Sequence, residues 1–123
     1  MTIHALLVDD DADTRAAVAL ALGLDPRFAA EAVSRFEAVE ALRQAGDSID
    51  VLLLDMKPAD MSANALVATM RQWSARPIPI LLLTANANDP RVWRSAGAQG
   101  AIAKPLDPMT LPDRIAEMLA AVA

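Results

Sequence analysis

Short apolar runs alternate along the chain with longer segments in which apolar residues recur at helical spacing. Five of these runs are continuous or nearly continuous in apolar residues, which is the pattern of strands buried on both faces of a parallel sheet. The runs predict strands at residues 3–8, 28–33, 49–54, 78–83 and 101–103.

The segments between the apolar runs carry the start and stop signals of helices. Ser34 and Glu37 have the spacing of a capping box, and Asp89 places an N-cap residue directly before a proline. Glycine is common just past a helix end. Five helices are predicted: 14–22 before Gly23, Ser34 to Gly46, 62–73, Asp89 to Gly97, and a last one that begins near Thr110 or Leu111, with Pro112 in its first turn.

The order of these elements predicts the fold class. Strands that alternate with helices form α/β domains, in which a parallel sheet is covered by helices on both faces. We expect a doubly wound, flavodoxin-like α/β domain with five helices and five strands in the order 2-1-3-4-5. The chain has 123 residues and no linker, repeat or low-complexity tract, so residues 1–123 are predicted to form a single domain.

Polar side chains follow four of the five predicted strands. Asp9 and Asp10 come after the first strand, Asp55 after the third, Thr84 after the fourth and Lys104 after the fifth. In the expected order the first and third strands are neighbours, so the three carboxylates meet. Two carboxylates ~4 Å apart repel by ~4 kcal/mol at an effective dielectric constant of ~20. We therefore expect a raised pKa for at least one acid, and a hard, oxygen-binding cation such as Mg²⁺.

Each of these residues also has a simpler interpretation. The acids of residues 9–13 could cap a helix, as could Asp55. Thr84 could be an ordinary residue at a strand end, and Lys104 a solvated charge. Their coincidence at four strand ends is what favours a functional site.

The composition narrows the possible partners and location. The chain has 11 basic and 16 acidic residues, a net charge of −5, which argues against direct binding to nucleic acid. It has no cysteine, which is consistent with a reducing compartment. Apolar stretches fall far short of the ~20 residues that span a bilayer, and the N-terminus lacks the basic region of a signal peptide. We expect a cytoplasmic protein that does not bind membranes.

Four motifs, "LLVDDD", "DVLLLDM", "ILLLTA" and "GAQGAIAKP", together resemble the receiver domains of bacterial two-component response regulators. The resemblance covers the whole chain. It implies that Asp55 accepts a phosphoryl group from a sensor histidine kinase or a histidine phosphotransfer protein. It also implies a phosphoacceptor domain that assists its own phosphorylation and dephosphorylation without being an enzyme. The chain ends after the last predicted helix and carries no effector domain, so we expect either a stand-alone receiver or one cut from a longer protein, with an output through a downstream protein partner.

The resemblance implies roles for the other residues at the strand ends as well. Thr84 would hydrogen-bond the phosphoryl oxygens, and Lys104 would pair with the phosphoaspartate. The Mg²⁺ ligands would be Asp9, Asp10, Asp55 and the backbone carbonyl of Lys57.

Three positions depart from the family pattern. In the loop after Asp55, Pro58 comes one place early and Ala63 replaces the usual glycine. Ala101 stands where receivers usually carry a switch aromatic, three places before the lysine. The first two departures predict a loop that differs locally, and Ala101 predicts that the usual relay through a moving aromatic ring is missing; phosphorylation itself is not affected.

Two other functions remain open from the sequence. A pseudo-receiver would keep the fold and bind partners without being phosphorylated. A flavodoxin-like flavin or nucleotide binder would need a Gly/Ser/Thr-rich phosphate loop after the first strand, and this chain has acids there.

Overall fold

The computed structural model describes residues 2–45, 48–55, 77–85, 87–95 and 97–122, together with the single residues 68 and 72. Its centre is a parallel sheet of five strands in the order β2-β1-β3-β4-β5, which confirms the predicted fold class. The strands are β1 (Ile3–Val8), β2 (Phe28–Val33), β3 (Val51–Asp55), β4 (Ile80–Thr84) and β5 (Gly100–Ala103). The described helices are α1 (Ala12–Gly23), α2 (Arg35–Ala45), α4 (Pro90–Ser95) and α5 (Leu111–Val122). Of the helix predicted at 62–73, only residues 68 and 72 are described, and both are helical; the rest of the range lies outside the described residues.

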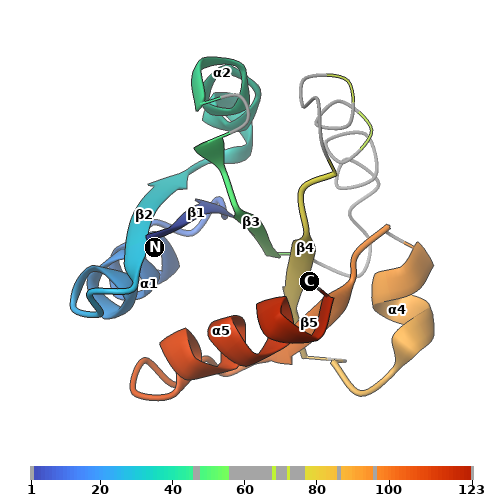
Figure 1. Ribbon diagram of the computed structural model, residues 1–123. Helices are drawn as coiled ribbons and strands as arrows, with labels where there is room; N and C mark the ends of the chain where they lie inside the picture. Colours follow the sequence, from blue (N-terminus) through green and yellow to red (C-terminus); the bar gives the residue numbers. More distant parts are fainter. Residues whose placement is uncertain are drawn as a thin grey trace.

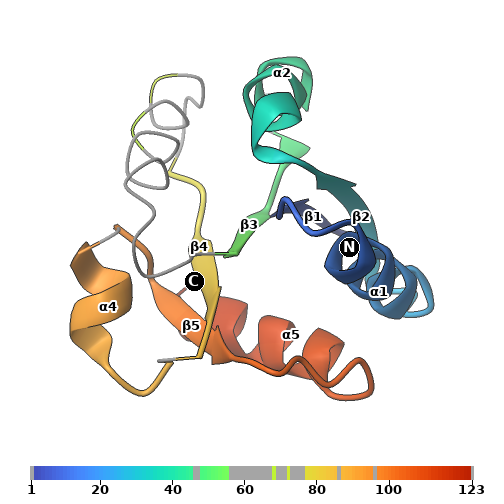
Figure 2. The same cartoon turned by 180° about the vertical axis from the view of Figure 1, so that it is seen from behind.

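Helices cover both faces of the sheet (Figures 1 and 2). Successive side chains of a strand point to opposite faces, so the apolar runs supply two cores. On one face Leu53 packs in a cluster with Val18 of α1 and Ile115 of α5. On the other face Leu54 packs in a cluster with Leu42 of α2. This burial on both sides explains why the strands are continuously apolar in sequence.

Two strands begin later than the sequence predicts. β4 begins at Ile80 rather than at residue 78, because Pro77 and Pro79 have no backbone N–H to donate to the sheet. The N–H of Ile80 donates to Oε1 of Gln99 at 2.7 Å. β3 begins at Val51 rather than at residue 49 and ends at residue 55, one residue later than expected. Both strands therefore extend to the residues of the candidate site.

Three helix ends follow their predicted signals. The backbone N–H of Ser34 donates to Oε1 of Glu37 at 3.1 Å, as in a capping box. Gly97, with φ of 80°, follows α4 in the left-handed conformation that glycine adopts most readily. α5 begins at Leu111, which places Pro112 in its first turn.

Gly100 leaves the space in which α5 packs on the sheet, and its replacement by alanine should destabilise the protein. A Cβ at this position would lie 2.6 Å from Cε of Met118. We expect Gly100→Ala to lower the free energy of unfolding by about 1 kcal/mol, the lower end for overpacking, because the end of a methionine side chain can move. Gly23→Ala is the matched control, since a Cβ there meets nothing within 4 Å. Equal denaturant midpoints for the two variants would contradict this packing argument.

Candidate functional site

The carboxyl ends of four strands bring the predicted residues to one edge of the sheet. Strand registers align these ends. Asp9 follows β1, Asp55 ends β3, Thr84 ends β4 and Lys104 follows β5. The backbone N–H of Lys104 donates to the carbonyl of Thr84 at 3.0 Å, which ties these two strand ends together.

Asp55 and Lys104 form an ion pair at this edge. Nζ of Lys104 donates to Oδ1 of Asp55. The side chain of Asp55 is 7% exposed and that of Lys104 is 34% exposed. A nearly buried carboxylate needs a compensating charge, and the half-exposed ammonium supplies one from the solvent side. Thr84 is also buried, at 4% exposure.

Asp9 is a buried acid beside Asp55. Its residue is 2% exposed, and Oδ1 accepts the backbone N–H of Asp11 at 2.9 Å. Burial raises the pKa of Asp9; the Asp11 N–H opposes this shift, the negative charge of Asp55 adds to it, and Lys104 opposes it. The raised pKa agrees with the expectation for one of these acids, but burial contributes more to it than the repulsion from Asp55 on which the expectation was based. Oδ2 of Asp9 is buried and has no hydrogen-bond partner among the described residues.

The three consecutive acids have three different environments. Asp9 is buried in the site, whereas Asp10 is exposed. Asp11 is the N-cap of α1: its carboxylate accepts the backbone N–H of Asp13 at 3.1 Å and the hydroxyl of Thr14 at 2.8 Å. This cap starts α1 two residues before the predicted start. The simpler interpretation as a helix cap is therefore correct for Asp11, while Asp9 belongs to the site.

The donor atoms at this edge fit a magnesium ion. Mg²⁺ is usually bound by one or two carboxylates and keeps several waters. Asp9 and Asp55 supply two carboxylates, and the buried, unpartnered Oδ2 of Asp9 is the kind of oxygen that a cation would satisfy. Within the described residues, no three acidic, histidine or cysteine side chains converge as a metal cluster. Lys57, the predicted carbonyl ligand, lies outside the described residues.

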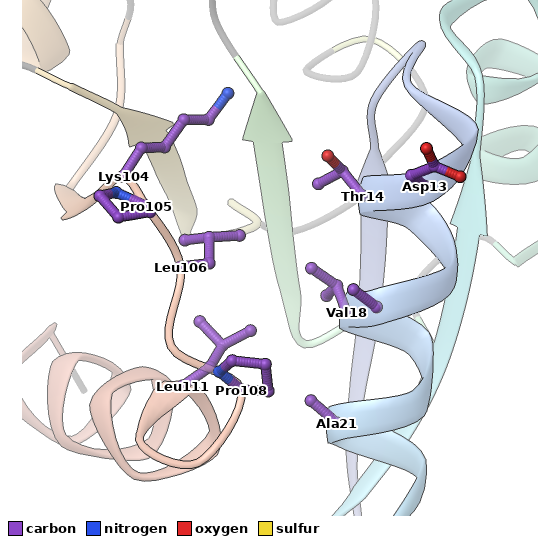
Figure 3. Close-up of a pocket in the computed structure, with 10 residues that line it drawn as sticks. Asp13, Thr14, Val18, Ala21, Lys104, Pro105, Leu106, Pro108 and Leu111 are labelled. Atoms are coloured by element: carbon purple, nitrogen blue, oxygen red, sulfur yellow. The ribbon is translucent and has the colours of Figure 1, made fainter.

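A groove opens next to Lys104, between α1 and the segment that links β5 to α5 (Figure 3). Its volume is about 340 Å³. Val18 and Ala21 line one side, Leu106 and Leu111 line the other, and Lys104 lies at the end nearest the sheet edge. The groove therefore joins an apolar surface to the polar site.

Sequence reasoning did not identify Arg15 as part of this region. Nη1 of Arg15 donates to the backbone carbonyl of Asp9 at 2.8 Å. Arg15 lies four residues after the cap Asp11, so one helical turn brings it back above the loop that carries the acids. Recognising Asp11 as the cap would have pointed to this arginine.

Ala101, the position of the missing aromatic, is buried in β5. It is 8% exposed and belongs to the core cluster on the α2 side of the sheet, against which Trp93 of α4 packs. A methyl group at this buried position has no alternative rotamer to adopt.

The comparisons with known proteins agree with this fold. The family model "Response regulator receiver domain" matches residues 5–116. Chemotaxis protein CheY4 of Vibrio cholerae is similar at 27% identity and a TM-score of 0.78, over 96% of this chain and 99% of that one. A response regulator from Thermotoga maritima has 25% identity and a TM-score of 0.78, over 98% and 99%. A LuxR family DNA-binding response regulator from Silicibacter pomeroyi has 25% identity and a TM-score of 0.70, over 97% and 92%. The sequence has no significant match among curated proteins.

The doubly wound sheet, with a buried acid pair and a lysine at its carboxyl edge, defines a flavodoxin-like α/β domain of the CheY type. The chain belongs to the response regulator receiver domain family. Domains of this family act in phosphorelay signalling, are phosphoacceptors rather than enzymes, and typically bind Mg²⁺ at the phosphorylation site. The pseudo-receiver alternative gains no support. Among the described helices, none is both long and apolar enough to cross a membrane.

Proposed function

We propose that Asp55 accepts a phosphoryl group from a phosphohistidine of a sensor histidine kinase or a histidine phosphotransfer protein. The observation that supports this proposal is the Asp55–Lys104 ion pair, with a second buried acid beside it. A carboxylate can act as a nucleophile towards phosphorus when neighbouring cations offset the charge that gathers there. Bound Mg²⁺, held by Asp9, Asp55 and the carbonyl of Lys57, would supply further positive charge to the phosphoryl oxygens. The fourth predicted ligand, Asp10, is exposed and would have to turn towards the ion.

The transfer breaks one bond and forms another. An oxygen of Asp55 forms the new O–P bond as the N–P bond of phosphohistidine breaks, and the leaving imidazole keeps the electron pair. Lys104, now paired with Asp55, remains within reach to pair with the phosphoaspartate. The hydroxyl of Thr84, at the end of the adjacent strand, donates to a phosphoryl oxygen. These groups also assist dephosphorylation by water.

The phosphodonor docks in the groove between α1 and the segment after β5. A protein that delivers phosphohistidine to Asp55 must contact the surface next to it, and this groove is continuous with Lys104 (Figure 3). Its apolar lining suits a helix of the donor protein.

Residues 1–123 form a single receiver domain. Its output is the binding of a downstream protein.

Phosphorylation by a small donor tests the proposal without a partner protein. We expect wild-type protein incubated with acetyl phosphate and Mg²⁺ to gain one phosphoryl group, about 80 Da by intact mass. Asp55→Asn should gain none, since an amide oxygen is a far weaker nucleophile. Asp107→Asn is the matched control, because Asp107 is exposed and an asparagine can still accept the N–H of Met109. Equal labelling of wild type and Asp55→Asn would place the acceptor elsewhere.

A further inference from the structure

The peptide of Asp9 is held from two sides at the point where β1 ends. Its N–H donates to the carbonyl of Val33 in β2 at 3.0 Å. Its carbonyl accepts Nη1 of Arg15 at 2.8 Å. A charged donor gives a stronger hydrogen bond than a neutral one, so the arginine is a strong restraint on the backbone that carries the Asp9 side chain.

The position of Arg15 is itself fixed by its surroundings. Arg15 is half-buried, and its backbone N–H donates to the carbonyl of Asp11 at 3.0 Å in the first turn of α1. The pKa of Asp11 is lowered first by the hydroxyl of Thr14, and the nearby charge of Arg15 adds to this effect. The pKa of Glu37 in α2 is lowered mainly by Ser34, and again Arg15 contributes. The positive charge of Arg15 therefore acts on acids in the first turns of two helices, while its guanidinium donates to the Asp9 carbonyl.

We propose that Arg15 is a positioning residue for the metal-binding and phosphoryl-accepting site. By holding the carbonyl of Asp9, it keeps the orientation in which Oδ1 accepts the Asp11 N–H and Oδ2 stays buried beside Asp55. Without this hydrogen bond the peptide after Asp9 can rotate, and the carboxylate turns away from the site. This inference rests on the proposed function, since it assigns Arg15 to the same site.

The direction in which magnesium affinity changes when Arg15 is replaced distinguishes a positioning role from a purely electrostatic one. Removing a positive charge near three acids would, by electrostatics alone, tighten the binding of a cation. Loss of positioning would weaken it, and partners that orient a metal ligand are typically worth 10- to 100-fold in affinity. We therefore expect Arg15→Gln to weaken Mg²⁺ binding by about 10-fold. Arg15→Lys, which keeps a long and positively charged donor where glutamine has a shorter, neutral one, should recover part of that loss.

Isothermal titration with MgCl₂ alone tests the inference, with melting temperatures measured in parallel. Arg27→Gln is the matched control. Arg27 pairs with Asp25 and Asp113, both at 2.7 Å, and lies just before the start of β2, away from Asp9 and Asp55 at the other end of the strands. It should lower the melting temperature and leave Mg²⁺ affinity unchanged. Unchanged or tighter Mg²⁺ binding by Arg15→Gln, or no binding by wild type, would overturn the inference. Wild-type protein that binds Mg²⁺ but takes no phosphoryl group would instead contradict the proposed function alone.

Discussion

Lys104→Ala is expected to slow phosphoryl acceptance by roughly 10²-fold at saturating Mg²⁺, the usual effect of removing one preorganised charge-stabilising donor from a reaction site. The structure pairs this ammonium with Asp55, a side chain that is only 7% exposed. The variant loses the cation that offsets the negative charge of Asp55 and of the transferred group. The rate is measured from intact mass during incubation with acetyl phosphate.

The matched control for this prediction is Arg91→Ala. It makes the same change in net charge. Arg91 lies in the first turn of α4, its side chain is 91% exposed, and it pairs with Asp89 just before the helix. We expect this control to be labelled at the wild-type rate. If Lys104→Ala were labelled as fast as the control, the ion pair would be structural and would have no part in phosphoryl transfer.

Asp9→Asn is expected to stabilise the metal-free protein at pH 7 by about 1–2 kcal/mol, in the range of the penalty for one buried polar atom without a partner. Asparagine keeps an oxygen to accept the Asp11 N–H, and its amide group replaces the unpartnered Oδ2 with a donor that faces Asp55. In Mg²⁺ the order should reverse, because wild type gains stability from binding the ion and the variant loses a ligand.

The pH dependence of this effect follows from the raised pKa of Asp9. Burial lifts that pKa above its ordinary value of 3.8, so the folded state holds the proton more tightly than the unfolded state. This contribution to stability is present below pH 3.8 and is lost as pH rises through the folded pKa. The stability difference between Asp9→Asn and wild type should therefore grow with pH over this window. Asp10→Asn, the same change at an exposed neighbour, should show a much smaller difference; equal effects would contradict the crowding of Asp9 and Asp55.

The sequence predicted the sheet well because its strands are buried on both faces. β1 and β2 begin and end where the apolar runs do. β4 begins later than predicted because Pro79 has no backbone N–H to donate to the sheet. The prediction was based on hydrophobicity, which does not take this missing donor into account. Asp9, Asp55, Thr84 and Lys104 lie at the predicted edge, since parallel strands end together.

Side-chain roles within the acidic run were harder to predict. Three consecutive aspartates look alike in sequence, and burial and hydrogen bonding separate Asp9 from Asp10 and Asp11. Arg15 was missed because its contact with the Asp9 carbonyl depends on where α1 begins. The spacing of residues in the sequence predicts which helix or strand each residue belongs to. Which polar atoms lack a hydrogen-bond partner depends on contacts in three dimensions.

The most direct test of the account is to locate the phosphoryl group. Reduction of an acyl phosphate with borohydride converts that aspartate to a residue about 14 Da lighter than the unmodified one, which marks the acceptor permanently. After incubation with acetyl phosphate and Mg²⁺, reduction and proteolysis, we predict this mass change in the peptide that contains Asp55, at residue 55. The same change at Asp9 or Asp10, or labelling at a residue other than an aspartate, would contradict the account.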